Sequence, residues 1–159
     1  MKAVIQLVSE ASVEIDGRET CSIGTGLLIF LGVGHGDKFE DSLWLARKIA
    51  NIRIFKDREN KTNLSTSDIG GDMLVVSQFT LLADLRRGNR PSLNSAASNE
   101  IAIPLYRAFI SELKKVFHGR VLSGEFGASM RVSLVNDGPF TVIINSKNQS
   151  KGKSGKNSV

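Results

Sequence analysis

Hydroxyl and amide side chains gather at the end of one apolar run, in the stretch SQFTL. Ser77, Gln78 and Thr80 follow the run MLVV directly. Each of these side chains can donate and accept hydrogen bonds, and the backbone amides of such a segment can face a ligand. The stretch therefore indicates a binding or catalytic corner. It is equally typical of a strand that leaves the core with its polar groups satisfied locally, so both interpretations stay open.

A second stretch, NDGPFT, lies between the apolar runs MRVSLV and VIIN, and this arrangement predicts a β-hairpin. Tight hairpins usually turn on Asn-Gly or Asp-Gly. Here Gly138 is followed by Pro139, which has a fixed φ and no backbone N–H. Because most X-Pro bonds in folded proteins are trans, turn rules alone predict a trans bond between these two residues.

Other signatures of chemistry are absent from the sequence. It contains neither a G-x-S-x-G nucleophile motif nor a G-x-x-x-x-G-K-[ST] phosphate loop. One cysteine and two histidines make no recognisable zinc cluster, so neither a metal nor a cofactor is expected. His35 lies in a glycine-rich turn and His118 at a predicted helix end. Those positions are typical of surface or capping residues rather than of general bases.

Positive charge is concentrated in two segments. The polar segment 85–98 contains three arginines that are either solvated or in contact with the phosphates of a nucleic-acid end. They are Arg86, Arg87 and Arg90. The tail 146–159 has four lysines and no acid, and it supplies four units of the formal net charge of +5. Because it has almost nothing to bury, we expect a disordered tail that either aids solubility or contacts RNA weakly.

The elements that would position these residues follow from the spacing of apolar residues. Strands are predicted in residues 3–8, 12–15, 19–23 and 27–33, and at the start of 53–63 and 72–84. Asp16-Gly17 is a strong turn signal. One amphipathic helix is predicted after an N-cap at Asp37, and another from near Pro104, which a helix tolerates only in its first turn. The second helix has an apolar stripe of Leu105, Phe109, Leu113 and Phe117.

The bulk properties of the chain fit a single mixed α/β domain whose sheets are covered by two helices. Its 159 residues are enough for one sizeable core. The single cysteine, Cys21, cannot form an internal disulfide, which favours a reducing compartment. Met1 opens directly into KAVIQLV, which is too short for a signal-peptide core, and no run reaches the roughly 20 apolar residues of a membrane span. We therefore expect a cytoplasmic protein.

The two polar stretches together resemble the D-aminoacyl-tRNA deacylase family, which is marked by an S-Q-x-T motif and an N-x-G-P-[VF]-T motif. Five further segments agree with that family in the same order: AVIQ, GLLIFLGV, NIRIFKD, ADLRRGNRPS and FGASM. The resemblance extends from about Met1 to Asn145. It implies a deacylase domain at 1–145, followed by the tail 146–159.

The resemblance implies a three-layer β/β/α domain that forms a homodimer, with the sheets meeting at the interface and the active site there. It implies hydrolysis of the ester that joins a D-amino acid to the 3′-terminal adenosine of tRNA, and also clearance of glycine from mischarged tRNA. The implied partners are therefore tRNA and a second copy of the chain, without a cofactor, metal or membrane.

The resemblance also assigns roles to residues of this sequence. Ser77, Gln78, Phe79 and Thr80 would line the reaction centre. Gly138 and Pro139 would form a cis peptide that reaches into the pocket of the partner subunit and rejects L-amino acids. The substrate and its adenosine would contact Phe126, Gly127, Met130 and Asn136. Leu7 stands where the family usually has an arginine that braces the Gly-Pro loop.

The expected mechanism uses backbone N–H groups around Phe79 and Thr80 as oxyanion donors, helped by the 2′-hydroxyl of the tRNA. An alternative makes the Thr80 hydroxyl a covalent nucleophile. Two other functions remain open. One is a non-catalytic tRNA-binding dimer that uses the arginine segment and the lysine tail, and the other is a protein whose NDGPFT segment serves only dimerisation. The preferred tRNAs and the main substrate do not follow from the sequence.

Overall fold

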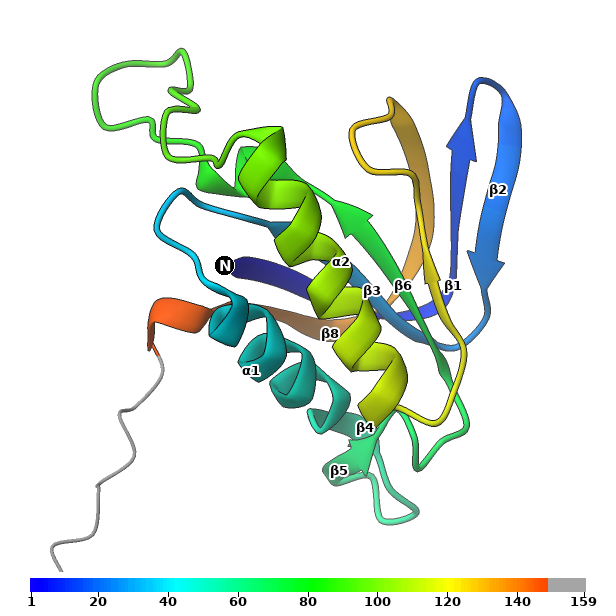
Figure 1. Cartoon of the computed structure of the whole chain (residues 1–159). Coiled ribbons are helices and arrows are strands. Elements are labelled where there is room, and N and C mark those ends of the chain that lie inside the picture. The colour runs from blue at the N-terminus through cyan, green and yellow to red at the C-terminus, as the bar shows by residue number, and fades with distance from the viewer. Residues whose placement is uncertain (149–159) are drawn as a thin grey trace, which may run out of the picture.

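The computed structural model describes residues 1–148 of the chain (Figure 1). Its elements are β1 (Lys2–Ile15), β2 (Arg18–Ile23), β3 (Gly26–Gly32), α1 (Phe39–Ala50), β4 (Arg53–Lys56), β5 (Thr62–Ser65), β6 (Asp72–Ser77), the 3-10 helix η1 (Phe79–Leu82), α2 (Asn99–Val116), β7 (Val121–Ser123), β8 (Met130–Asn145) and the 3-10 helix η2 (Ser146–Asn148). No helix within these residues is long and apolar enough to cross a membrane.

One six-stranded sheet forms the centre of the domain, in the order β2-β1-β3-β6-β7, with β8 paired to β1. Strand β1 is antiparallel to β2, β3 and β8, whereas β6 is parallel to both β3 and β7. The two short strands predicted at 3–8 and 12–15 are the two halves of β1: the first half pairs with β3 and the second with β2. The predicted turn is confirmed, since Asp16 and Gly17 both have positive φ, at 51° and 76°.

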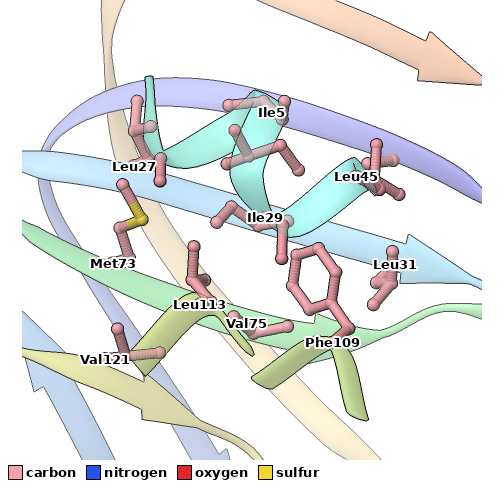
Figure 2. Close-up of a cluster of buried hydrophobic side chains, with 14 of the residues drawn as sticks. Ile5, Leu27, Ile29, Leu31, Leu45, Met73, Val75, Phe109, Leu113 and Val121 are labelled. Carbon is pink, nitrogen blue, oxygen red and sulfur yellow. The ribbon is translucent and has the colours of Figure 1, made fainter. Parts of the chain in front are cut away.

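Both faces of the sheet bury apolar side chains. On one face, Ile29 and Val75 of the sheet pack with Leu45 of α1 and Phe109 of α2 (Figure 2). On the other face, residues of β1, β2, β3 and β6 form a second cluster. Its buried members are Val8, Ala11, Val13, Ile23, Leu28, Leu74 and Val76. The predicted mixed α/β domain with helices over its sheet is therefore confirmed, and helices α1 and α2 cover the same face (Figure 1).

The two helices form where apolar periodicity predicted them, but both begin elsewhere. The N-cap of α1 is Lys38, so the prediction of Asp37 was wrong. Asp37 instead accepts a hydrogen bond from the Gly34 N–H at 2.7 Å. Helix α2 begins at Asn99, so Pro104 lies inside it rather than in its first turn. The predicted stripe of α2 is confirmed, because Leu105, Phe109, Leu113 and Phe117 are all buried.

Strand β8 corrects the predicted hairpin. Its halves MRVSLV and VIIN do not pair with each other, because both pair with β1. Asn136 lies opposite Val8 and Thr141 lies opposite Gln6. Residues 137–140 are therefore extra residues that leave the ladder as a bulge, and β8 continues past them in the same direction. The bulge forms because both halves of β8 pair with β1, a long strand distant in sequence, and local turn rules take no account of such a partner.

The start and end of the described chain meet in a cluster of charges. The Met1 amino group pairs with Asp37 at 2.5 Å and donates to the Ser146 hydroxyl at 2.6 Å. The Lys147 ammonium lies 2.9 Å from Asp41 and 3.1 Å from Asp37. Ser146 and Lys147, which the sequence assigned to the tail, thus belong to the packed structure. The remainder of the predicted disordered tail, 149–159, lies outside the described residues.

This cluster makes stability depend on pH. Burial raises the pKa of Asp41, but hydrogen bonds from Lys147 and from the Lys38 N–H outweigh it and lower that pKa to about 2 from 3.8. A depressed carboxyl pKa stabilises the fold above the unfolded pKa, and this contribution is lost as pH falls through the folded pKa. Between pH 5 and pH 2, the free energy of unfolding should fall by about 2 kcal/mol more in the wild type than in Asp41→Asn. Urea denaturation at several pH values measures this difference, and parallel profiles for the two chains would contradict it.

Candidate active site

A cavity of about 300 Å³ opens where the parallel strands β3 and β6 end. Its lining residues come from β3, from the β6–η1 corner, from the start of α2 and from the loop after β7. They are Leu31, Val33, Ser77, Gln78, Phe79, Ala97, Asn99, Ala102, Phe126 and Gly127. Clefts at the carboxyl ends of parallel strands are frequent ligand sites. Five of the residues expected at the site from sequence are therefore brought together here: Ser77, Gln78, Phe79, Phe126 and Gly127.

The corner between β6 and η1 presents backbone donors beside this cavity. The Gln78 N–H donates to the Leu31 carbonyl at 2.8 Å, which ties the corner to β3. Within the described part of the chain, the next two N–H groups, those of Phe79 and Thr80, have no protein acceptor. A short helix begins at Phe79, and N–H groups in the first turn of a helix lack partners within the helix. Two adjacent donors are thus available for a ligand.

The side chains of this corner contain no evident proton acceptor for a nucleophile. The Gln78 Nε2 amide donates to the Thr80 Oγ1 at 2.5 Å. An amide N–H cannot take a proton from a hydroxyl. Among residues 1–148, no histidine, carboxylate, lysine or cysteine lines the cavity. Within residues 1–148, no group of three or more His, Cys, Asp and Glu side chains is placed to hold a metal ion. The arrangement therefore favours polarising a bound group over activating a side chain.

Phe126 forms one wall of the cavity, and Tyr106 packs against its ring. Its ring packs edge-to-face against Tyr106 of α2, with centroids 5.3 Å apart and an interplanar angle of 62°. The Tyr106 hydroxyl in turn donates to the Val75 carbonyl of β6 at 3.2 Å. Burial raises the pKa of Tyr106, so the hydroxyl remains a donor. The next residue, Gly127, has φ of 80°, which favours glycine. An aromatic face fixed in this way suits stacking against a base.

The NDGPFT bulge projects from the sheet elsewhere on the same chain. Gly138 and Pro139 are exposed, are joined by a cis peptide bond and do not line the cavity. The Asn136 amide holds the bulge, donating to the Leu7 carbonyl at 2.7 Å and the Phe140 carbonyl at 3.3 Å. The side chain of Leu7 is buried, so at this position the backbone carbonyl, rather than a side chain, makes the contact.

The other residues expected from sequence do not line the cavity. Thr80 is exposed beside it, and Met130 packs against the second apolar cluster. In the arginine segment, Arg86 forms a 2.6 Å ion pair with Asp84, and hydrogen bonds from Arg86 lower the pKa of Asp84 to about 2. Arg87 and Arg90 are exposed.

Sequence reasoning missed several cavity residues, of which Asn99 is the polar one. Ala97 lies at the end of the arginine segment, and Asn99 follows that segment directly. A backbone hydrogen bond attaches the segment to the chain just after β3, because the Ala97 N–H donates to the Val33 carbonyl at 2.9 Å. The first turn of α2 therefore enters the site, and its N-terminal dipole favours negative charge there. The Ser98-Asn99 pair is typical of a helix start, and this signal could have placed the start of α2 at the site.

Comparisons with known proteins agree with the motifs. The family model described as D-Tyr-tRNA(Tyr) deacylase matches residues 4–145. The chain is 58% identical over 146 residues to a D-aminoacyl-tRNA deacylase of Roseiflexus castenholzii, with 92% of each chain covered. It is 53% identical over 149 residues to one of Flavobacterium psychrophilum, covering 94% of this chain and 99% of that one.

Solved structures show the same fold. A structure described as c-Myc DNA Unwinding Element Binding Protein superposes with a TM-score of 0.86 at 37% identity, covering 91% of this chain and 98% of that one. A structure of a probable eukaryotic D-amino acid tRNA deacylase gives a TM-score of 0.77 at 15% identity, covering 90% and 97% of the two chains. At that identity the second likeness concerns the fold alone.

Proposed function

Because the chain belongs to the D-Tyr-tRNA(Tyr) deacylase family, it is a D-aminoacyl-tRNA deacylase, and we propose that it hydrolyses its substrate in the cavity at the ends of β3 and β6. The observation that carries this placement is the pair of backbone N–H groups of Phe79 and Thr80, which have no protein acceptor within the described residues. Of the functions left open by the sequence, the purely dimerising protein has no use for such donors.

The terminal adenosine would stack on Phe126 and pass Gly127, which would bring the ester carbonyl to the β6–η1 corner. Water then adds to the carbonyl carbon, and the oxyanion that forms accepts hydrogen bonds from the Phe79 and Thr80 N–H groups. The bond to the 3′-oxygen breaks next, and the neighbouring 2′-hydroxyl of the tRNA relays to that oxygen the proton that the attacking water loses. The ester is already activated, so positioning and oxyanion stabilisation can supply most of the rate.

Selection of D-amino acids would come from the bulge of a second copy of the chain. Gly138 and Pro139 do not line the cavity of their own chain, so their proposed role requires a homodimer. Exposed apolar side chains on both sides of the bulge support this: Val135 is 49% exposed and Ile143 is 68% exposed. Phe79, which lines the cavity, is 56% exposed. Two faces of this kind would bury one another on dimerisation.

In that dimer, the Gly138 carbonyl of the partner chain would hold the substrate α-amine. An L side chain would then point into the backbone of the bulge, whereas a D side chain would point away from it. Rejection by a clash needs little recognition of the side chain itself, so D-amino acids of many sizes should be accepted. Glycine has no side chain to clash, so glycyl-tRNA should be hydrolysed as well.

The role of Thr80 separates the two mechanisms. Thr80→Ala keeps the backbone N–H and removes the hydroxyl, so kcat on D-Tyr-tRNA should fall less than about tenfold, because only a side-chain contact is lost. Single-turnover deacylation measures the rate, and tRNA binding measured in parallel shows that the site still forms. Complete loss of hydrolysis with binding intact would instead favour Thr80 as the nucleophile.

A further inference from the structure

A second cavity, of about 440 Å³, lies on the other side of Phe126, in a groove between α2 and β7. Phe126 lines both this groove and the active-site cavity. Ser123 and Gly124 of the β7 segment form one wall of the groove. Helix α2 forms the other wall, with Ile103, Arg107, Ile110 and Lys114 among its residues. Phe126 therefore separates the groove from the active-site cavity and contributes to both.

The residues of the α2 wall form one stripe along the helix. Positions 103, 107, 110 and 114 follow the spacing of residues on one helical face. Arg107 and Lys114 are exposed, whereas the two isoleucines between and beside them are half-buried. The opposite flank of α2 faces α1, because Glu112 pairs with Arg47 there at 2.6 Å. The groove thus combines an apolar floor with a positively charged rim.

The charges of the rim are available to a ligand. Among the described residues, neither Arg107 nor Lys114 takes part in an ion pair, in contrast to Arg47 and Arg120. None of the described residues that line the groove is acidic, and Glu125, next to Phe126 in sequence, is exposed outside it. Seven residues of α-helix place the backbones of Arg107 and Lys114 about 10 Å apart along the axis. The long side chains of Arg107 and Lys114 can converge from that span on successive phosphates of a single strand.

We propose that this groove binds the single-stranded nucleotides that immediately precede the terminal adenosine of the tRNA. The inference rests on the proposed function, which places that adenosine at Phe126. The chain of the RNA must leave the active-site cavity, and the groove shares Phe126 with that cavity. Arg107 and Lys114 would contact the phosphates, and Ile103 and Ile110 would contact sugars and bases. Cations along an apolar or aromatic surface are the usual means of holding a single strand.

The experiment compares two substrates in two charge variants. One variant combines Arg107→Ala with Lys114→Ala. Its matched control combines Lys115→Ala with Lys48→Ala, two exposed cations that do not line the groove; Lys115 lies in the same last turn of α2 as Lys114. The substrates are D-Tyr-tRNA and D-tyrosyl-adenosine, the latter of which occupies only the active-site cavity.

In the groove variant, kcat/KM for D-Tyr-tRNA should fall about tenfold or more. The slope of log kcat/KM against log salt concentration should become less negative by about one to two, because one or two phosphate contacts are lost. Hydrolysis of D-tyrosyl-adenosine should stay within about twofold of wild type, and the control variant should match wild type on both substrates. Unchanged kcat/KM and salt dependence for D-Tyr-tRNA, or equal losses on both substrates, would overturn the proposal.

A binding assay tests the groove without requiring hydrolysis, so its result does not depend on the proposed function. An unacylated RNA oligonucleotide ending in CCA, followed by fluorescence anisotropy, should bind the groove variant more weakly than the control variant. If wild type hydrolyses neither substrate, the proposed function fails while this comparison still decides the groove. Equal binding of the oligonucleotide by both variants would contradict the proposal.

Discussion

Phe79→Pro should lower kcat on D-Tyr-tRNA by about 10²–10³-fold, which is the usual effect of removing one oxyanion donor. Proline has no backbone N–H, so this change deletes one of the two proposed donors. The local backbone can accept it, because Phe79 is the first residue of η1, a position where helices tolerate proline. The preceding residue, Gln78, has φ of −144° and ψ of 83°, outside the α region that a following proline disfavours.

The matched control for this change is Phe79→Ala, which removes the same ring and keeps the N–H. Its kcat should fall less than about tenfold if the backbone donor carries the effect. Circular dichroism and the oligomeric state of both variants, compared with wild type, report whether the fold is intact. Equal losses of kcat in the two variants would place the effect in the ring and remove the argument for an oxyanion site.

Asn136→Ala should reduce the preference for D- over L-Tyr-tRNA by at least about tenfold. Its amide holds the bulge at both ends, through the Leu7 and Phe140 carbonyls. Without these two hydrogen bonds, the backbone around Gly138 can move. An L side chain then meets a backbone that can shift away, so the L substrate is rejected less strongly. Rates on D- and L-charged tRNA, measured at equal enzyme concentration, give the ratio.

The control for Asn136 is Ser133→Ala, an exposed position on the same strand that pairs with Ser12, away from the bulge. It should leave the D/L ratio unchanged. A general loss of stability would lower the rates on both substrates together, so it cannot imitate a change in their ratio. An Asn136→Ala protein with the wild-type ratio would show that the bulge does not select chirality.

Local sequence predicted those parts of the fold that depend on local spacing. Asp16-Gly17 turned the chain as expected, the stretch 27–33 became a buried strand, and Leu105, Phe109 and Leu113 formed the core face of a helix. What the sequence did not reveal depends on distant partners. NDGPFT has the local features of a turn, yet both of its flanks pair with β1, so it forms a bulge within one strand.

In the candidate site, too, the residues that depend on local sequence were predicted and those that depend on distant partners were not. Ser77, Gln78 and Phe79 of the SQFT stretch line the cavity, and a polar run at the end of an apolar strand is visible in the sequence. Asn99 and Ala97 were missed, because they reach the cavity only through the pairing of their segment with the end of β3. Ser146 and Lys147 were assigned to the tail on composition, yet they bind the Met1 amino group, Asp37 and Asp41 across the length of the chain.

The central claim is hydrolysis of D-aminoacyl-tRNA with rejection of the L form. The most direct measurement is the rate at which the wild-type protein releases tyrosine from D-Tyr-tRNA and from L-Tyr-tRNA under identical conditions. The account predicts rapid release from the D substrate and release from the L substrate at least about a hundredfold slower, since a steric clash of a few kcal/mol is enough for that ratio. Comparable hydrolysis of the two substrates would contradict it.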